Sequence, residues 1–440
     1  MKILFVENRY KTGLWEVIAK EYEKEGHEIF WIVQNPIFKP SSKNVTVLPF
    51  PKKKRLEKIY TPEIKKIIDG NRGMNYFGIK SDDFIFWYQK EIEKALETIK
   101  PDLAFGEPTL FHELLVINAC KKRGILYLHP STTRYPNNRF SFYLYDTQVP
   151  YKGSKDLLSN DMALKTVEAI QARQALPDYM SVLRYKLTRL DWLKDKLRLS
   201  LSYYLGERYN TPSPFVKRKI NSHYAKNGLR WEEIAVDPTK IKKDGFHVLY
   251  AMQMQPEANI DVWGYPNNNQ TQVIQRILND LKGSDKLLLK PNPKSKYEIS
   301  MELLDLIKSN SERIIVLKHS SKIADVWLIT DVVVTVTGTI AIECVFDNMP
   351  VIMLGEASHT KQKNCYHLKA NESMQPIFDL IKKGDFPKMS SEEKVAYLQE
   401  LMQTSFEGTN GDGLHNSNYL KDAQNLTRLK TAYTRIIHGF

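Results

Sequence analysis

The stretch that decides the fold is DVVVTVTGTIAIECVFDNMPVIMLG, residues 331–355. Its apolar runs at 332–336 and 350–354 are rich in β-branched residues and are not interrupted by polar ones. This pattern is typical of strands that are covered on both faces of a parallel sheet. The segment 340–347 between the two runs favours a helix, so the sequence predicts a strand, a short turn, a helix and a second strand.

The turn in this stretch consists of Thr337, Gly338 and Thr339. Backbone N–H groups and two hydroxyls are expected at the N-terminus of the following helix, where the helix dipole favours an anion such as phosphate. The alternative is that the two threonines only cap the helix. Both interpretations remain open on this stretch alone.

Alternation of strands and helices occurs in two parts of the chain, which predicts the α/β class with two Rossmann-like domains facing across a cleft. We expect a first Rossmann-like domain at 1–150 and a second at 241–386. A helical, basic connecting segment is predicted at 151–240. The helices predicted at 387–440 are expected to pack back toward the first domain.

Composition narrows the class of protein. The 440 residues are 42% apolar and 26% charged, which is ordinary for a globular protein. Three cysteines do not suggest a disulfide scaffold, and they fit a reducing compartment. The start of the chain does not resemble a secretory leader, and no apolar run is long enough to span a bilayer. We therefore expect a cytoplasmic protein.

Positive charge is concentrated in one segment. The net charge is +13, and residues 184–230 contain twelve lysines and arginines against three acidic residues. A leucine stripe in this segment is flanked by the basic residues, so an amphipathic helix on an anionic membrane is one interpretation. A helix that packs its leucines on the protein is the other. The leucines of this stripe are Leu183, Leu187, Leu190, Leu197 and Leu201.

Nucleic-acid binding is a competing class, but no nucleic-acid motif is present, so we do not expect that partner.

In the first half, three residues are candidates for acid–base chemistry. Glu107 and His129 are expected beyond the carboxyl ends of two strands, where ligands bind in open α/β sheets. His112 lies on the first turn of the intervening predicted helix. The polar, aromatic segment 132–147 is too long for a simple connection, which makes it a candidate binding loop.

The second half carries polar groups after three successive predicted strands, and in one parallel sheet these would meet at one edge. Lys290 offers a point charge for a phosphate, and Glu343 offers an acceptor for ribose hydroxyls. Each residue alone also has a structural interpretation, as a strand-end lysine, a turn former or a solvated helix residue. Together they favour a nucleotide site, and its predicted residues are Gln255, Glu257, Lys290, Asn292, Thr337, Gly338, Thr339 and Glu343.

The second half of the chain resembles the C-terminal half of bacterial capsular polysaccharide biosynthesis transferases. The segments that carry the resemblance are FHVLYAMQMQPEA, LLLKPNP and residues 331–355. Those are GT-B glycosyltransferases that include Kdo transferases and are related to sialyltransferases. PDLAFGEPTLFHELLVINACKKRGI and TRYPNNRF are similar to their first half. The most specific segments are QPE, KP-x-P and TGT with the glutamate that follows.

The resemblance implies a CMP-activated ulosonic acid as donor and a surface polysaccharide or lipid-linked glycan as acceptor. It implies that the KP-x-P and TGT turns hold the phosphate, while Gln255, Glu257 and Glu343 meet the cytidine or ribose. Asn292 departs from the family, which commonly has histidine there. Asparagine can donate a neutral hydrogen bond but no proton and no positive charge.

Glycosyl transfer needs a base near the acceptor hydroxyl and stabilisation of the leaving phosphate. The base is predicted to be Glu107, with His112 and His129 as lesser candidates. Common metal and cofactor signatures are absent, so no metal and no cofactor are expected besides the donor. The alternatives are a UDP-sugar or CDP-polyol phosphate donor, and a non-catalytic protein of capsule assembly.

Overall fold

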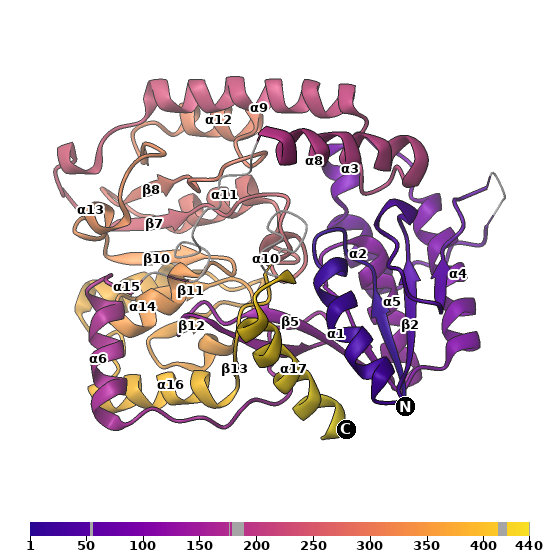
Figure 1. Cartoon of the computed structure of the whole chain (residues 1–440). Coiled ribbons are helices and arrows are strands. Elements are labelled where there is room, and N and C mark those ends of the chain that lie inside the picture. The colour runs from indigo at the N-terminus through magenta and orange to yellow at the C-terminus, as the bar shows by residue number, and fades with distance from the viewer. Residues whose placement is uncertain (53–55, 176, 178–188, 412–419, 440) are drawn as a thin grey trace. The chain divides into compact units, whose positions relative to one another are not determined.

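The computed structural model describes residues 1–52, 56–175, 177, 189–411 and 420–439. They form two compact units. Unit 1 comprises residues 1–158, 176–217 and 399–440, within which only the described residues are discussed, and unit 2 comprises residues 159–175 and 218–398. Each unit contains one sheet with helices on both of its faces (Figure 1).

The sheet of unit 1 has seven strands in the order β13-β6-β5-β4-β1-β2-β3. The strands from β5 to β3 in this order are parallel, whereas β6 and β13 pair antiparallel at one edge. Their bounds are β1 Lys2–Val6, β2 Glu28–Val33, β3 Val45–Val47, β4 Leu103–Phe105, β5 Leu126–Thr132, β6 Arg139–Leu144 and β13 Phe406–Glu407.

Strand β1 shows how both faces of this sheet are covered. Ile3 and Phe5 belong to the cluster that includes α1 and α17, whereas Leu4 and Val6 belong to the cluster that includes α2, α4 and α5. Because successive side chains of a strand point to opposite faces, the two clusters form two separate layers. The helices of unit 1 are α1 Thr12–Lys24, α2 Pro62–Asp69, α3 Arg72–Tyr76, α4 Asp83–Ile99, α5 Phe111–Arg123, α8 Arg189–Leu201 and α17 Ala423–His438.

The sheet of unit 2 has six parallel strands in the order β12-β11-β10-β7-β8-β9. Residue Val333 of β10 pairs with Val351 of β11, so the two strands predicted from residues 331–355 are direct parallel neighbours. The bounds are β7 His247–Ala251, β8 Lys286–Lys290, β9 Ile314–Val316, β10 Val332–Thr335, β11 Val351–Met353 and β12 Cys365–His367.

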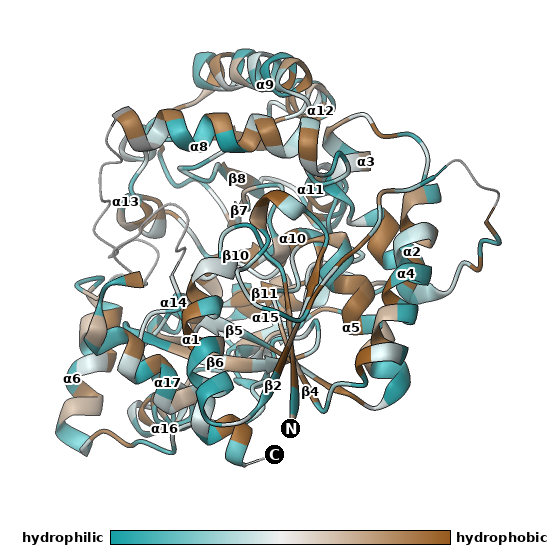
Figure 2. Ribbon diagram, turned by 45° about the vertical axis from the view of Figure 1, so that its right-hand side comes forward, coloured by the Kyte–Doolittle hydropathy of each residue, from teal (hydrophilic) through white to brown (hydrophobic). Residues whose placement is uncertain are grey.

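One face of this second sheet packs against α11, α12, α15 and the buried Trp231 of α9. Helix α14 packs against β10, β11 and α6. In Figure 2 the strands are mainly apolar while the helices alternate between apolar and polar bands, as expected of helices that bury one side. The helices are α6 Asn160–Gln171, α9 Pro214–Ile234, α10 Ala258–Asp261, α11 Gln270–Asp280, α12 Met301–Ser309, α13 Ile323–Trp327, α14 Ile340–Asp347, α15 Gln375–Lys383 and α16 Ser391–Gln403, with α9 and α16 crossing unit boundaries.

Both sheets have the strand order of a doubly wound fold. In unit 1 the order reverses between β1 and β4, and in unit 2 it reverses between β7 and β10. Ligands of such sheets bind beyond the carboxyl ends of the strands at this reversal. The predicted α/β class with two Rossmann-like sheets is confirmed, and the fold points to the ends of β1, β4, β7 and β10.

Two expectations differ from the structure. The segment 132–147 is not one long loop, because residues 139–144 form β6, whose Phe140 and Phe142 are fully buried. The helical segment predicted at 151–240 is not one body, since α6 belongs to unit 2, α8 belongs to unit 1 and α9 begins in unit 1 and continues in unit 2. Leu183 and Leu187 lie outside the described residues. Among the described helices, none has both the length and the apolar composition needed to cross a bilayer.

Candidate functional site

The strand-end groups of unit 2 converge at the carboxyl edge of its sheet. After β7, Gln253 meets Thr337, which follows β10: the Thr337 N–H donates to Gln253 Oε1 at 3.0 Å, and Gln253 Nε2 donates to Thr337 Oγ1 at 3.2 Å. These two residues therefore span the reversal in strand order. Both side chains are buried.

The turn after β8 is tied to the turn after β7 through Glu298, which is 5% exposed. Glu298 Oε2 accepts hydrogen bonds from the N–H groups of Lys296 at 2.9 Å, Tyr297 at 3.1 Å and Gln255 at 3.4 Å. Its second oxygen, Oε1, is buried and has no hydrogen-bond partner among the described residues. A buried carboxylate oxygen in this state is costly, so it marks a place where a ligand donor would be favourable.

Lys290, the last residue of β8, is 6% exposed. Its ammonium group donates to the backbone oxygens of Pro291 at 2.9 Å and His319 at 3.2 Å. Among the described residues no carboxylate forms an ion pair with it. Burial lowers the pKa of Lys290 to about 8, with Glu232 opposing the change. A buried ammonium group that forms no direct ion pair favours an anionic ligand.

The turn around Asn292 is built by the asparagine itself. Asn292 Oδ1 accepts from the Lys294 N–H at 2.8 Å, and its backbone oxygen accepts from the N–H of Ser295 at 2.9 Å and from its hydroxyl at 2.8 Å. Asn292 remains half-buried. Asn292 therefore forms this turn, as asparagine commonly does, in addition to any contact with a ligand.

The Thr-Gly-Thr turn is partly committed to protein contacts. The Thr337 hydroxyl donates to the Asn259 carbonyl, and the Gly338 N–H donates to Thr335 Oγ1 at 3.1 Å. Thr339 precedes α14, and its side chain makes no capping hydrogen bond. Glu343 lies on the first turn of α14, where it was predicted, and is half-buried. Thr339 is therefore the hydroxyl of this turn that remains suited to a ligand.

Gln255 also supports the protein in this structure. Its Nε2 donates to Asp261 Oδ1 and to the Asn268 carbonyl, both at 2.9 Å, and its Oε1 accepts from Gln270 Nε2 at 3.0 Å. Glu257 directly precedes α10, and its side chain is half-buried. Its backbone N–H donates to Asp261 Oδ2 at 3.0 Å. Gln255 therefore shapes the turn that presents Glu257.

Sequence patterns did not identify Gln270 and Glu298 as members of the predicted site, whereas Gln253 was expected among the polar groups that follow β7. Gln270 Oε1 accepts from the Gln253 N–H at 2.8 Å, and its Nε2 donates to the Gln253 carbonyl at 2.7 Å. The first residue of α11 thus holds the chain after β7. The only sequence signal for these residues is an amide or carboxylate placed directly before or after a predicted strand or helix.

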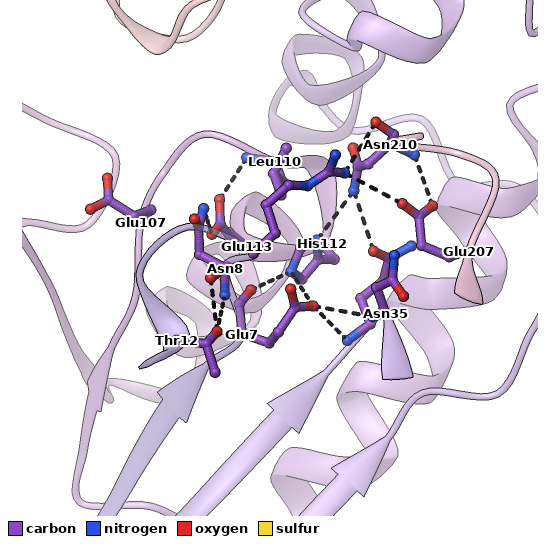
Figure 3. Close-up of polar contacts among 12 residues, drawn as sticks. Glu7, Asn8, Thr12, Asn35, Glu107, Leu110, His112, Glu113, Glu207 and Asn210 are labelled. Atoms are coloured by element: carbon purple, nitrogen blue, oxygen red, sulfur yellow. Dashed lines mark hydrogen bonds and ion pairs between the residues drawn. The ribbon is translucent and has the colours of Figure 1, made fainter. Parts of the chain in front are cut away.

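Unit 1 has its own polar cluster where its strand order reverses. Glu7 and Asn8 follow β1, and Glu113 lies on α5; the cluster is drawn in Figure 3. Asn8 Nδ2 donates to Glu113 Oε1 at 2.8 Å, while Glu113 Oε2 accepts from the Leu110 N–H at 2.6 Å. Glu7 Oε2 accepts from the Asn35 N–H at 3.1 Å. These bonds fix the loops at the carboxyl edge of the sheet.

The carboxyl groups of this cluster are almost completely shielded from water. Burial raises the pKa of Glu7 to about 7 and that of Glu113 to about 8. Glu207 is also buried, and it accepts hydrogen bonds from the N–H groups of Tyr209 at 2.6 Å and Asn210 at 2.8 Å. Its Oε1 lies 3.8 Å from Arg9 Nη2. None of these residues was predicted from the sequence.

Glu107 follows β4 and is half-buried, unlike Glu7 and Glu113. Figure 3 shows its carboxylate apart from the hydrogen-bonded cluster. Burial raises its pKa to about 7, and Lys11 and Arg134 oppose the change. A partly accessible carboxyl group with a pKa near neutrality has the properties of a general base.

The two predicted histidines are fully buried. His112 lies on the first turn of α5, and its Nε2 donates to the Glu7 carbonyl at 2.8 Å. His129 lies within β5 rather than beyond its end, because the antiparallel pairing with β6 extends the strand to Thr132. Its Nε2 donates to the Thr147 carbonyl at 2.8 Å. Burial lowers the pKa of each to about 4, so both are neutral at pH 7.

No protein-family model and no curated protein sequence matches the chain. Among solved structures, the UDP-GlcNAc 2-epimerase of Methanocaldococcus jannaschii is 12% identical, with 91% of this chain and 99% of that chain covered and a TM-score of 0.29. The β-Kdo 2,4 transferase KpsC of Thermosulfurimonas dismutans is 10% identical, with 69% and 78% covered and a TM-score of 0.38. MurG of Acinetobacter baumannii is 8% identical, with 96% and 99% covered and a TM-score of 0.27. These values assign neither a family nor an activity.

Proposed function

We propose that this chain is a glycosyltransferase that moves an ulosonic acid from a CMP-activated donor to a surface polysaccharide or lipid-linked glycan. The observation that carries the proposal is the buried ammonium group of Lys290, which has no ion pair among the described residues. It lies at the carboxyl end of β8, in the sheet whose strand order places ligands at that edge. A phosphate there would supply the missing negative charge.

Donor binding is assigned to unit 2. Lys290 would contact the phosphate, and Thr339 and the N-terminus of α14 would donate hydrogen bonds to it. Glu343 and Glu257 would accept from ribose hydroxyls or the cytosine amino group. Lys290 is charged below its pKa of about 8, so it can stabilise the leaving CMP at neutral pH.

Acceptor activation is assigned to Glu107 of unit 1. Its pKa of about 7 lets it accept a proton from a sugar hydroxyl near neutral pH. The transfer then forms the bond between the acceptor oxygen and the anomeric carbon and breaks the bond to the CMP phosphate oxygen. The proposal needs no metal ion, because Lys290 and hydrogen-bond donors neutralise the leaving phosphate.

The decisive experiment compares CMP with cytidine, which lacks the phosphate. CMP should bind the wild-type protein more tightly than cytidine, and Lys290→Met should weaken CMP binding by about ten- to a hundredfold, the usual value of a charge-assisted hydrogen bond. Cytidine affinity should not change. The matched control is Lys286→Met at the opposite end of the same strand, where Lys286 donates to the Glu312 carbonyl.

Other outcomes would overturn the proposal. Equal CMP affinity in wild type and Lys290→Met would show that Lys290 does not bind the phosphate. Binding of UDP without binding of CMP would indicate that the donor is a UDP-sugar. A preference for CDP would indicate a CDP-polyol phosphate donor. Calorimetric titration of all three nucleotides separates these cases.

We also propose that α8 brings the protein to an anionic membrane, where a lipid-linked acceptor would reside. Leu190 is 68%, Leu193 58% and Leu197 60% exposed, and Lys194, Lys196 and Arg198 are exposed on the same helix. Leucines spaced in this way with flanking cations are typical of helices that lie on a bilayer surface. Cosedimentation with phosphatidylglycerol vesicles, but not with phosphatidylcholine vesicles, is expected. Leu193→Glu should reduce it, and equal sedimentation of this variant would contradict the proposal.

A further inference from the structure

Three side chains with metal-binding atoms meet at the amino end of β2 in unit 1, whereas the residues assigned above follow the carboxyl ends of strands. They are Glu25, His27 and His438, and one ligand atom of each lies within 4.8 Å of the others. Glu25 is the C-cap of α1, His27 precedes β2, and His438 is the last residue of α17. The three therefore come from two parts of the chain that are separated by about 400 residues in sequence.

The first two residues are held by the tight turn that ends α1. Gly26 adopts φ +89°, a conformation that favours glycine, and reverses the chain between Glu25 and His27. The His27 N–H donates to the Tyr22 carbonyl at 3.0 Å, and its ring packs edge-on against the Tyr22 ring, with the centroids 6.0 Å apart. Both ligand positions thus belong to a defined turn.

Helix α17 brings His438 to this turn. The Tyr22 hydroxyl donates to the Lys430 carbonyl at 3.0 Å and lies 3.0 Å from Thr434 Oγ1. Lys430, Thr434 and His438 are spaced by four residues, so they lie on one face of the helix. Tyr433, Ile436 and Ile437 of the same helix are buried in the core with α1. The helix packing therefore directs His438 toward the end of α1.

One atom of the group lacks the partner that it needs. His27 Nδ1 is buried and has no hydrogen-bond partner among the described residues. Glu25 pairs with the Lys430 ammonium group at 3.2 Å, which is an exposed contact and easily exchanged. Glu25 and His438 are exposed, so their side chains can rotate without disturbing the core.

We propose that Glu25, His27 and His438 bind a divalent transition-metal ion, best Zn²⁺, that fastens the end of α17 to the turn between α1 and β2. Two imidazoles and one carboxylate are a donor set that zinc accepts, with water as the fourth ligand. Ligand atoms around zinc lie roughly 3.4 Å apart for bonds of about 2.1 Å. Rotation of the exposed Glu25 and His438 side chains would have to bring the ligand atoms from their spacing of up to 4.8 Å to this one.

The proposal does not depend on the proposed glycosyl transfer, and the metal ion would have a structural role. Sequence patterns did not reveal the site, because the two histidines have no characteristic local spacing. Hard cations such as Mg²⁺ prefer oxygen ligands and should not bind to the group.

The test uses the full-length, tag-free protein stripped with a chelator. Calorimetric titration with ZnCl₂ should show one saturable site, and titration with MgCl₂ should show none. His438→Gln should weaken Zn²⁺ binding by at least about tenfold, since one of three protein ligands is lost. His438 is exposed at a helix end, so this variant should fold. The matched control is His367→Gln, an exposed histidine on β12 in unit 2, which should bind as wild type does.

A second measurement tests the fastening itself. Hydrogen exchange in the last turn of α17 should slow when Zn²⁺ is added to the wild-type protein and should not change in His438→Gln. The proposal is overturned if wild type binds no Zn²⁺ in a saturable manner, if His438→Gln binds with wild-type affinity, or if Zn²⁺ leaves the exchange of α17 unchanged. The titrations use no nucleotide, so these outcomes leave the proposed function unaffected.

Discussion

Thr337 and Gln253 exchange two hydrogen bonds across the reversal of strand order in unit 2, at 3.0 Å and 3.2 Å. Each residue follows a different buried strand, β10 or β7, and both side chains are buried. The pair therefore sets the separation of two strand ends at the edge where α/β sheets bind ligands.

Gln253→Leu should weaken CMP binding by about tenfold. The substitution leaves the Thr337 N–H without its acceptor, which costs about 1–3 kcal/mol and displaces the Thr-Gly-Thr turn. Calorimetric titration with CMP measures the loss. Gln275→Leu on the exposed side of α11 is the matched control and should bind as wild type does. Wild-type affinity in Gln253→Leu would mean that the turn does not contribute to the site.

Glu107→Gln should lower the rate of transfer by about 10²- to 10⁴-fold and leave CMP affinity unchanged, because the variant loses the base but keeps unit 2 intact. In the wild type the rate should rise with pH up to about 7, where Glu107 loses its proton, and should fall above about 8, where Lys290 loses its charge. This rise should be absent in the variant. Glu97→Gln on α4, whose side chain is 70% exposed, is the control.

The stability of Glu107→Gln provides a check on folding. The pKa of Glu107 is raised from 4.5 to about 7, so its contribution to stability is present below pH 4.5 and is lost as the pH rises through 7. Removing the carboxyl group should therefore not destabilise the protein at pH 8. A large loss of stability there would show that the fall in rate comes from unfolding.

The sheet of unit 2 could be predicted because its strands are continuous apolar runs, as in Val332–Thr335 and Val351–Met353. Lys290 and Thr337 could be placed at one edge for the same reason, since parallel strands end together. The sequence could not predict that the N–H and the hydroxyl of Thr337 donate hydrogen bonds to other residues of the protein. Gln253 and Asn259 reach them only through the tertiary fold.

The polar cluster of unit 1 could not be found from the sequence because its members are distant along the chain. Asn8 and Glu113 are 105 residues apart, yet they share a hydrogen bond of 2.8 Å. The available signal was the position of Glu7 and Asn8 directly after a buried strand. Strand β6 was missed for a different reason. Polar residues at 132–139 conceal the alternation of Phe140 and Phe142 with Ser141.

Burial of His129 makes the stability of unit 1 sensitive to acid. Its pKa is lowered from 6.5 to about 4, so its contribution to stability is present above pH 6.5 and is lost as the pH falls toward 4. Between pH 7 and pH 5 the free energy of unfolding of the wild type should fall by roughly 2 kcal/mol relative to His129→Gln, in which the side chain does not titrate. Urea unfolding at both pH values measures this difference.

The control for this effect is His223→Gln, which changes an exposed histidine of α9. Its free energy of unfolding should follow that of the wild type from pH 7 to pH 5. If His129→Gln also follows the wild type, the imidazole of His129 titrates normally, and its assignment as a buried neutral group is wrong.

Asn292→His tests whether asparagine at this position limits the proposed reaction. Asn292 is half-buried and forms its turn through a single side-chain bond to the Lys294 N–H, so histidine should fit at a cost of about 1 kcal/mol in stability.

A protonated histidine beside the leaving phosphate adds a positive charge and a proton donor that asparagine lacks. The rate of donor cleavage should rise by about tenfold or more below pH 6.5, where histidine is charged, and should approach the wild-type rate at pH 8. Hydrolysis of a CMP-linked ulosonic acid, followed as CMP release, measures the rate. Asn292→Gln separates size from charge, because it enlarges the side chain without adding a titrating group. A variant histidine that leaves the rate unchanged at every pH would show that residue 292 does not contact the phosphate.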